Sequence, residues 1–265
     1  RYSGACGLTM AFTPDQLLGY VNMLFWPFVR ISALLMAAPL FGARTFPVRQ
    51  RILLGFIVAM LVAPMLPPVP VIQIFSAEGM LITVHQVVIG VAMGFILQMV
   101  FGAMVVAGQT IATSMGLGFA ATIDPQNGVQ VPVVSQYFLI MATLVFLALN
   151  GHLILMETVV ESFYLWPISA GALPENMMMH VVTWISEVFK GALLIALPAV
   201  AAILLVNLAF GVMTRAAPQI NIFAVGFPIT IIAGFIMILL SLPVFLPQFT
   251  TLLEAGFLQM LVMLD

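Results

Sequence analysis

The stretch VIGVAMGFILQMVFGAMVVAG, residues 88–108, carries no charged side chain. A helix needs about 20 consecutive apolar residues to cross a membrane, and this stretch supplies them. Gly90 and Gly94 lie four positions apart in it, and Gln98 and Gly102 continue the same step. Small residues at this spacing share one helix face and allow a second helix to approach closely. The stretch therefore predicts a membrane helix that packs closely against another helix, either in the same chain or in another subunit, and both alternatives remain open.

The composition of the whole chain agrees with a membrane environment. Of its 265 residues, 63% are hydrophobic and only 6% are charged, whereas about a quarter of the residues of soluble proteins are charged. Strict alternation, which would indicate a membrane β-barrel, is not the dominant pattern. We therefore expect an all-α, membrane-associated bundle of roughly six or seven kinked or broken helices. The expected apolar segments are 17–40, 52–66, 80–115, 133–167, 177–210, 222–246 and 250–264.

Several of these segments fit a simple membrane span badly. Residues 52–66 and 250–264 are short, and residues 80–115 would overshoot a bilayer. Prolines interrupt the others, and broken helices of this kind are tolerated where neighbouring protein satisfies the freed backbone groups. Residues 10–265 are expected to form a single domain that begins near Met10, and residues 1–9 are expected to be an upstream extension or a remnant of cloning.

The charged residues exclude some classes of function. The formal net charge is -2, from seven basic and nine acidic residues, which is not the electrostatic footprint of a nucleic-acid-binding protein. The basic cluster ARTFPVRQR, residues 43–51, is expected on the cytoplasmic side by the positive-inside rule. Catalytic and nucleotide-binding motifs are missing from the sequence, so neither an enzyme nor a cofactor is expected. The histidines lack the spacing of metal ligands; they are His85, His152 and His180.

The remaining ionisable residues allow one alternative function. Glu157 and Glu161 lie four positions apart, on one helix face, and inside a membrane they would be candidates for the proton site of a secondary transporter. The favoured interpretation is that this part of the chain lies outside the hydrocarbon. Glu187 and Lys190 lie three positions apart and are expected to pair with each other.

Two segments between the apolar runs stand out. GLGFAATIDPQNG, residues 116–128, combines turn-forming pairs with glycines that can adopt positive φ. VMTRAAPQINIFAVGFPI, residues 212–229, forms a polar elbow followed by a kinked helix entry. A third notable segment lies before them in the chain: FWPFVRISALLMAAPLFGARTFPVRQRILLGFIVAMLVAPMLP, residues 25–67. Together they resemble the FliR family, the R-type subunits of the flagellar type III export gate, from about Met10 to the C-terminus.

The resemblance implies a function and an assembly. The chain would be a subunit of the gate through which unfolded flagellar proteins leave the cytoplasm, in the bacterial inner membrane at the flagellar basal body. Its partners would be P-type, Q-type and B-type subunits (FliP, FliQ and FlhB), in a helical assembly that stands partly above the bilayer. The alternatives are an injectisome-type export gate, a proton-coupled transporter that uses Glu157 and Glu161, and, least favoured, a membrane-embedded enzyme.

The resemblance also implies roles for particular residues. The loop at 115–128 would plug the export channel, and bulky apolar side chains there suit a constriction that blocks ions by dewetting. The candidate plug residues are Met115, Gly116, Leu117, Gly118, Phe119, Ile123, Asp124 and Pro125. The candidates for subunit packing are Gly90, Gly94, Gly102, Arg215, Pro218, Gln219 and Asn221.

Overall fold

The structure is a computed structural model that describes residues 14–43, 46–118, 121–123, 130–216 and 222–265. The described residues form seven α-helices, and the prediction of an all-α bundle is confirmed. The helices are α1 (Pro14–Ala37), α2 (Val48–Val62), α3 (Ala77–Ser114), α4 (Val133–Ala148), α5 (Gly151–Leu165), α6 (Met177–Ala216) and α7 (Ile222–Val262). A short 3-10 helix, η1 (Ala63–Met65), continues α2.

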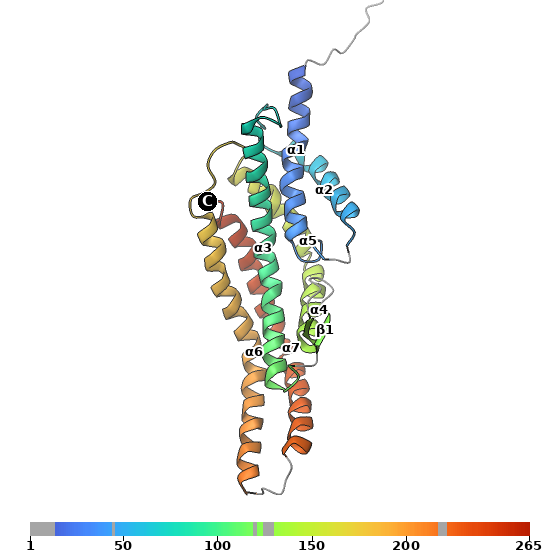
Figure 1. The fold of residues 1–265 in the computed structure, drawn as a ribbon, viewed down its shortest axis with the longest axis vertical. Helices are drawn as coiled ribbons and strands as arrows, with labels where there is room; N and C mark the ends of the chain where they lie inside the picture. The colour runs from blue at the N-terminus through green and yellow to red at the C-terminus, as the bar shows by residue number, and fades with distance from the viewer. Residues whose placement is uncertain (1–13, 44–45, 119–120, 124–129, 217–221) are drawn as a thin grey trace, which may run out of the picture.

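The bundle is elongated and is organised around α3 (Figure 1). α3 contacts α1, α4, α6 and α7, and its N-terminal cap is the Ser76 hydroxyl, which accepts a hydrogen bond from the backbone N–H of Gly79 at 3.0 Å. α6 and α7 form a long hairpin that extends beyond the C-terminal end of α3 (Figure 1). The segment that links α3 to α4 therefore lies beside the projecting part of the molecule.

A cluster of phenylalanine rings holds α3, α4 and α7 together. The ring centroids of Phe101 and Phe249 are 6.0 Å apart, and those of Phe138 and Phe245 are 5.6 Å apart. Phe146 packs edge-on against Phe101 at 5.6 Å. All five side chains are at most 2% exposed. Aromatic pairs of this geometry contribute about 0.5–1.5 kcal/mol each beyond the area that they bury, so the cluster fixes α7 against the centre of the bundle.

Five helices are long and apolar enough to cross a membrane: α1, α2 with η1, α3, α6 and α7. α4 and α5 form a sixth candidate if the two count as one span, and they are bent by 68° at the break. The expected segment 133–167 is therefore two helices. The break lies at Asn150, which has φ 55 in the left-handed region; asparagine tolerates this conformation better than most residues.

At the C-terminus, two expected segments form one helix. Residues 222–246 and 250–264 were expected to be separate, but α7 runs through both and contains Pro243 and Pro247. Hydroxyl groups bond to backbone carbonyls around these prolines: Ser241 Oγ donates to Ile238 O at 2.9 Å, and Thr251 Oγ donates to Pro247 O at 2.9 Å. Packing and hydroxyl side chains of this kind allow membrane helices to contain proline.

The link between α3 and α4 contains a small β-hairpin that the sequence did not predict. β1 (Ala121–Ile123) pairs antiparallel with β2 (Gln130–Pro132), and Thr122 lies opposite Val131. The hairpin makes backbone hydrogen bonds within itself, so the link does not depend on neighbouring helices for these bonds.

Candidate functional site

The candidate site is the segment between α3 and α4, and its first residues end α3. Gly116 has φ 79, and its N–H donates to Thr113 O at 3.1 Å. The N–H of Leu117 reaches back to Ala112 O at 2.8 Å. A left-handed residue followed by such a backward bond is a common helix ending, and glycine is the residue that adopts it without strain. The chain therefore turns sharply at Gly116.

This turn packs against α7. The side chain of Met115 is 1% exposed and lies beside Gly234, where an added Cβ would come within 2.5 Å of Met115 Cγ and Cε. A Cβ at Gly116 would come within 2.8 Å of the ring of Phe227. Both glycines are therefore needed for this close approach, which fixes the start of the segment to α7.

The other end of the segment is held where α4 begins. Ser135 Oγ donates to Val105 O of α3 at 3.0 Å. A Cβ at Gly108 would come within 2.5 Å of Ser135 Cα, so α3 and the first turn of α4 are in backbone contact. The sequence contained a signal for this contact, a further small residue on α3, but it did not identify the partner helix.

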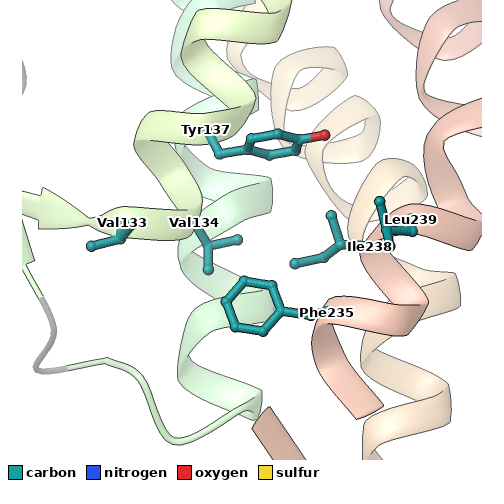
Figure 2. Close-up of a pocket in the computed structure, with 6 residues that line it drawn as sticks. All are labelled: Val133, Val134, Tyr137, Phe235, Ile238 and Leu239. Atoms are coloured by element: carbon teal, nitrogen blue, oxygen red, sulfur yellow. The ribbon is translucent and has the colours of Figure 1, made fainter. Parts of the chain in front are cut away.

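An apolar cavity of about 280 Å³ lies between α4 and α7 at this end. Figure 2 shows Val134 of α4 and Phe235 of α7 pointing into the same space. The lining residues are Val133, Val134, Tyr137, Phe235, Ile238 and Leu239. The first end of the segment thus packs against α7 at Gly234, whereas the second end faces Phe235 and Ile238 of α7 across this cavity.

The structure describes the surroundings of half of the candidate plug residues, and two of these four are glycines. Met115 lies in the core, Leu117 is half-buried against it, and Gly116 and Gly118 have described backbone and surroundings. Ile123 belongs to β1. Phe119, Asp124 and Pro125 lie outside the described residues.

The glycine stripe of α3 lies against α1 over part of its length. A Cβ at Gly90 would come within 2.4 Å of Arg30 O, and one at Gly94 would come within 2.6 Å of Ala37 Cβ. At these two positions the close approach is within the chain. Gly102 differs, since a Cβ there would meet nothing within 4 Å. Gly102 is therefore the part of the stripe that has open space beside it, and its role in subunit packing stays a prediction.

Arg30 is the centre of a buried polar cluster whose partners the sequence did not reveal. Its side chain is fully buried on α1. Nε donates to Gln86 Oε1 of α3 at 2.8 Å, and Nη1 and Nη2 donate to the carbonyls of Ser162 and Trp166 at 2.9 and 3.0 Å. The guanidinium also lies 4.0 Å from the ring centroid of Phe163. A cation is stabilised by the carbonyl groups at a helix C-terminus, so Arg30 holds the end of α5 against α1 and α3.

The other charged residues mostly face outward. Glu157 and Glu161 are exposed on α5. The expected pair is confirmed: Lys190 Nζ lies 3.1 Å from Glu187 Oε2, and both side chains are exposed. In the part of the chain that the structure describes, groups of three or more residues that could hold a metal ion do not occur.

The basic cluster and the polar elbow are described only in part. Arg51 is buried and donates to the carbonyls of Ala43 and Phe46 at 3.1 and 3.3 Å, whereas Arg49 is exposed. Arg215 is exposed in the last turn of α6. The other elbow positions, Pro218, Gln219 and Asn221, lie outside the described residues, as does Arg44.

Comparison with known proteins identifies the family. The family described as bacterial export proteins, family 1, matches residues 21–256. The flagellar biosynthetic protein FliR of Pectobacterium carotovorum subsp. carotovorum is 39% identical to this chain over 90% of the chain and 91% of that protein. FliR of Escherichia coli (strain K12) is 36% identical over 89% of the chain and 90% of that protein. FliR of Bacillus subtilis (strain 168) is 34% identical over 82% of the chain and 85% of that protein.

These names describe proteins of flagellar biosynthesis and export, and they do not indicate catalytic activity. The match covers nearly all of the chain, and the apolar helices are those of a multi-pass protein of the inner membrane. The chain therefore belongs to the bacterial export proteins of family 1 and, among them, to the FliR proteins of the flagellar export apparatus.

Proposed function

We propose that this chain forms part of the channel of the flagellar type III export gate, and that residues 115–128 plug the channel at rest. The observation that carries the proposal is the anchoring of this segment. It leaves the central helix at a glycine turn that packs against α7, and its other end is held to α3 at Gly108 and Ser135. A segment whose two ends are anchored in this way is suited to close a passage and to move aside for a polypeptide.

The β-hairpin supports this role. Because β1 and β2 pair with each other, the hairpin can keep these backbone hydrogen bonds when it leaves its resting place, so those N–H and C=O groups stay paired. Apolar side chains around it would exclude water from a narrow passage and so block ions. Such a plug combines an ion seal with a low cost of displacement.

The length of α6 and α7 supports an assembly with other subunits. The helices have 40 and 41 residues, and at 1.5 Å per residue each is about 60 Å long. The hydrocarbon core of a bilayer is only about 30 Å thick. Large apolar side chains are nevertheless exposed along most of α6, from Met178 to Met213. We infer that P-type, Q-type and B-type subunits (FliP, FliQ and FlhB) cover much of this surface.

The plug is tested by deleting residues 117–123 in the native gate. We expect the deletion to leak small ions across the membrane while the gate still assembles, because α3 and α4 keep their contacts at Gly108. Membrane conductance is the measurement, and deletion of residues 169–171, in the link between α5 and α6, is the control. An assembled deletion gate with unchanged conductance would contradict the plug.

The assembly is tested separately. A tagged chain is purified in mild detergent from its native membrane, and the bound proteins are identified by mass spectrometry. We expect small apolar P-type and Q-type subunits in one large complex. Recovery of the chain alone, as a stable monomer or homodimer, would refute the proposed assembly.

A further inference from the structure

Met115 and Gly234 make the tightest contact between α7 and the segment that follows α3. Met115 caps α3 and is almost completely buried. An added Cβ at Gly234 would lie 2.5 Å from its Cγ and Cε and 2.6 Å from its Sδ. Real Cβ atoms do not approach other atoms this closely, so the methionine side chain occupies a notch beside Gly234 and would have to shift if residue 234 carried a Cβ.

The contacts on the other side of the same turn are looser. Phe235 and Ile238 face Val134 across the cavity of about 280 Å³ (Figure 2). Empty space in a protein interior means lost contacts, so α4 is less firmly held to α7 here. The contacts at Gly234 and at Phe227 are therefore the ones that hold the start of the segment to α7, and the contact at Gly234 is the closer of the two.

α7 has a feature that would let it move at this place. Pro228 lies one to two turns before Gly234, and a proline inside a helix removes one backbone hydrogen bond and favours a kink. The part of α7 before this point belongs to the hairpin that projects beyond α3 (Figure 1). A methionine side chain is unbranched and adapts to irregular spaces, so it can leave a notch and enter it again.

We propose that Met115 and Gly234 form a latch, in which α7 holds the start of the 115–128 segment and releases it when α7 shifts relative to α3. The role of the latch in opening the gate rests on the proposed function, because it requires that the segment is a plug. The contact itself is tested without reference to ion flow.

The test measures how accessible Leu117 is to a thiol reagent in native membranes. The probe is Leu117→Cys in a chain whose native cysteine is replaced by Cys6→Ser. Gly234→Ala places a methyl group in the notch, and Met115→Ala empties the notch without adding atoms. Gly211→Ala is the matched control, since a Cβ at Gly211 on α6 would meet nothing within 4 Å.

We expect both latch variants to raise the labelling rate about tenfold, which corresponds to about 1.4 kcal/mol of lost contact, while the control leaves the rate unchanged. In a chain that already carries Met115→Ala, Gly234→Ala should not raise the labelling rate further, because the methionine atoms with which its methyl group collides are gone. If Gly234→Ala does not accumulate, Met115→Ala carries the test alone.

Unchanged labelling in the latch variants would overturn the latch, and so would an additive effect in the double variant. Failure of the plug has a different signature. If labelling rises but neither the latch variants nor the deletion of residues 117–123 leak ions, the latch stands and the plug is refuted. If the deletion leaks and labelling stays constant, the plug stands and the latch is refuted.

Discussion

Replacement of Arg30 by methionine tests how much the buried polar cluster stabilises the bundle. Methionine is similar in length but donates no hydrogen bond. Ser162 O would keep a partner, because the N–H of Trp166 also donates to it, at 3.0 Å. Ser162 Oγ would keep its bond to Val159 O at 2.6 Å. The acceptors that lose this donor are Gln86 Oε1, on a side chain that is 1% exposed, and Trp166 O.

The expected loss follows from these contacts. A buried acceptor without a partner costs about 1–3 kcal/mol. The cation at the C-terminus of α5 and the contact with the Phe163 ring contribute about 0.5–2 kcal/mol each. Removing a charge from the interior has the opposite effect, so we expect a net loss of about 2–4 kcal/mol. At about 2–4 °C per kcal/mol for a chain of this size, Tm should fall by about 5–15 °C.

The assay is thermal unfolding of the purified chain in detergent, followed by tryptophan fluorescence. Arg30→Lys distinguishes geometry from charge, since an ammonium group cannot reproduce the fork of the guanidinium. We expect lysine to be at least as destabilising as methionine, because it keeps the buried charge with fewer hydrogen bonds. Arg49→Ala, at an exposed arginine, should change stability by no more than about 0.5 kcal/mol. Full stability of Arg30→Lys would refute the reasoning.

Three further predictions concern other positions. Gly94→Leu should prevent accumulation of folded chain, because even the Cβ of the leucine would collide with α1. Gly102→Leu should leave the chain folded and impair only its assembly with other subunits. The amount of chain in the membrane and the co-purification of other subunits distinguish the two outcomes. Gly108→Ala should lower stability by about 1–3 kcal/mol, since its Cβ would meet the backbone of α4, and thermal unfolding measures this. The double variant Glu157→Gln, Glu161→Gln should leave the export of flagellar proteins unchanged, because both side chains are exposed. A loss of proton-dependent export in this variant would instead favour the transporter alternative.

The parts of the fold that could be predicted depend on spacing along the chain. Apolar runs predicted the helices, and small residues four apart on α3 predicted a close helix contact. Glu187 and Lys190 paired as their spacing indicated. Each of these features is decided within a few turns of one helix, where side-chain neighbours follow from helix geometry alone.

The parts that could not be predicted depend on residues far apart in the sequence. The bonds from Arg30 reach across 56 residues to Gln86 and 136 residues to Trp166, and the sequence showed only a charge in an apolar segment. The notch for Met115 is made by Gly234, one of many glycines without a distinguishing motif. Local rules also conflicted: the prolines Pro243 and Pro247 favour a break, but α7 is continuous there and packs through Phe245 and Phe249 against α4 and α3.

Burial within the chain divides the long helices into two kinds. In the most apolar window of α3, 61% of the residues are buried, compared with 22% in α6 and 28% in α7, although the mean hydropathy of these two helices, 2.6, exceeds the 2.2 of α3. Hydropathy alone would place the most apolar helices in the centre. Their apolar surface instead remains open, so something outside the chain must cover it. The helix that is most buried within its own chain is therefore α3, and the helices that depend most on their surroundings are α6 and α7. A shift of those surroundings would act first on α7, and through the contact at Gly234 on the segment between α3 and α4.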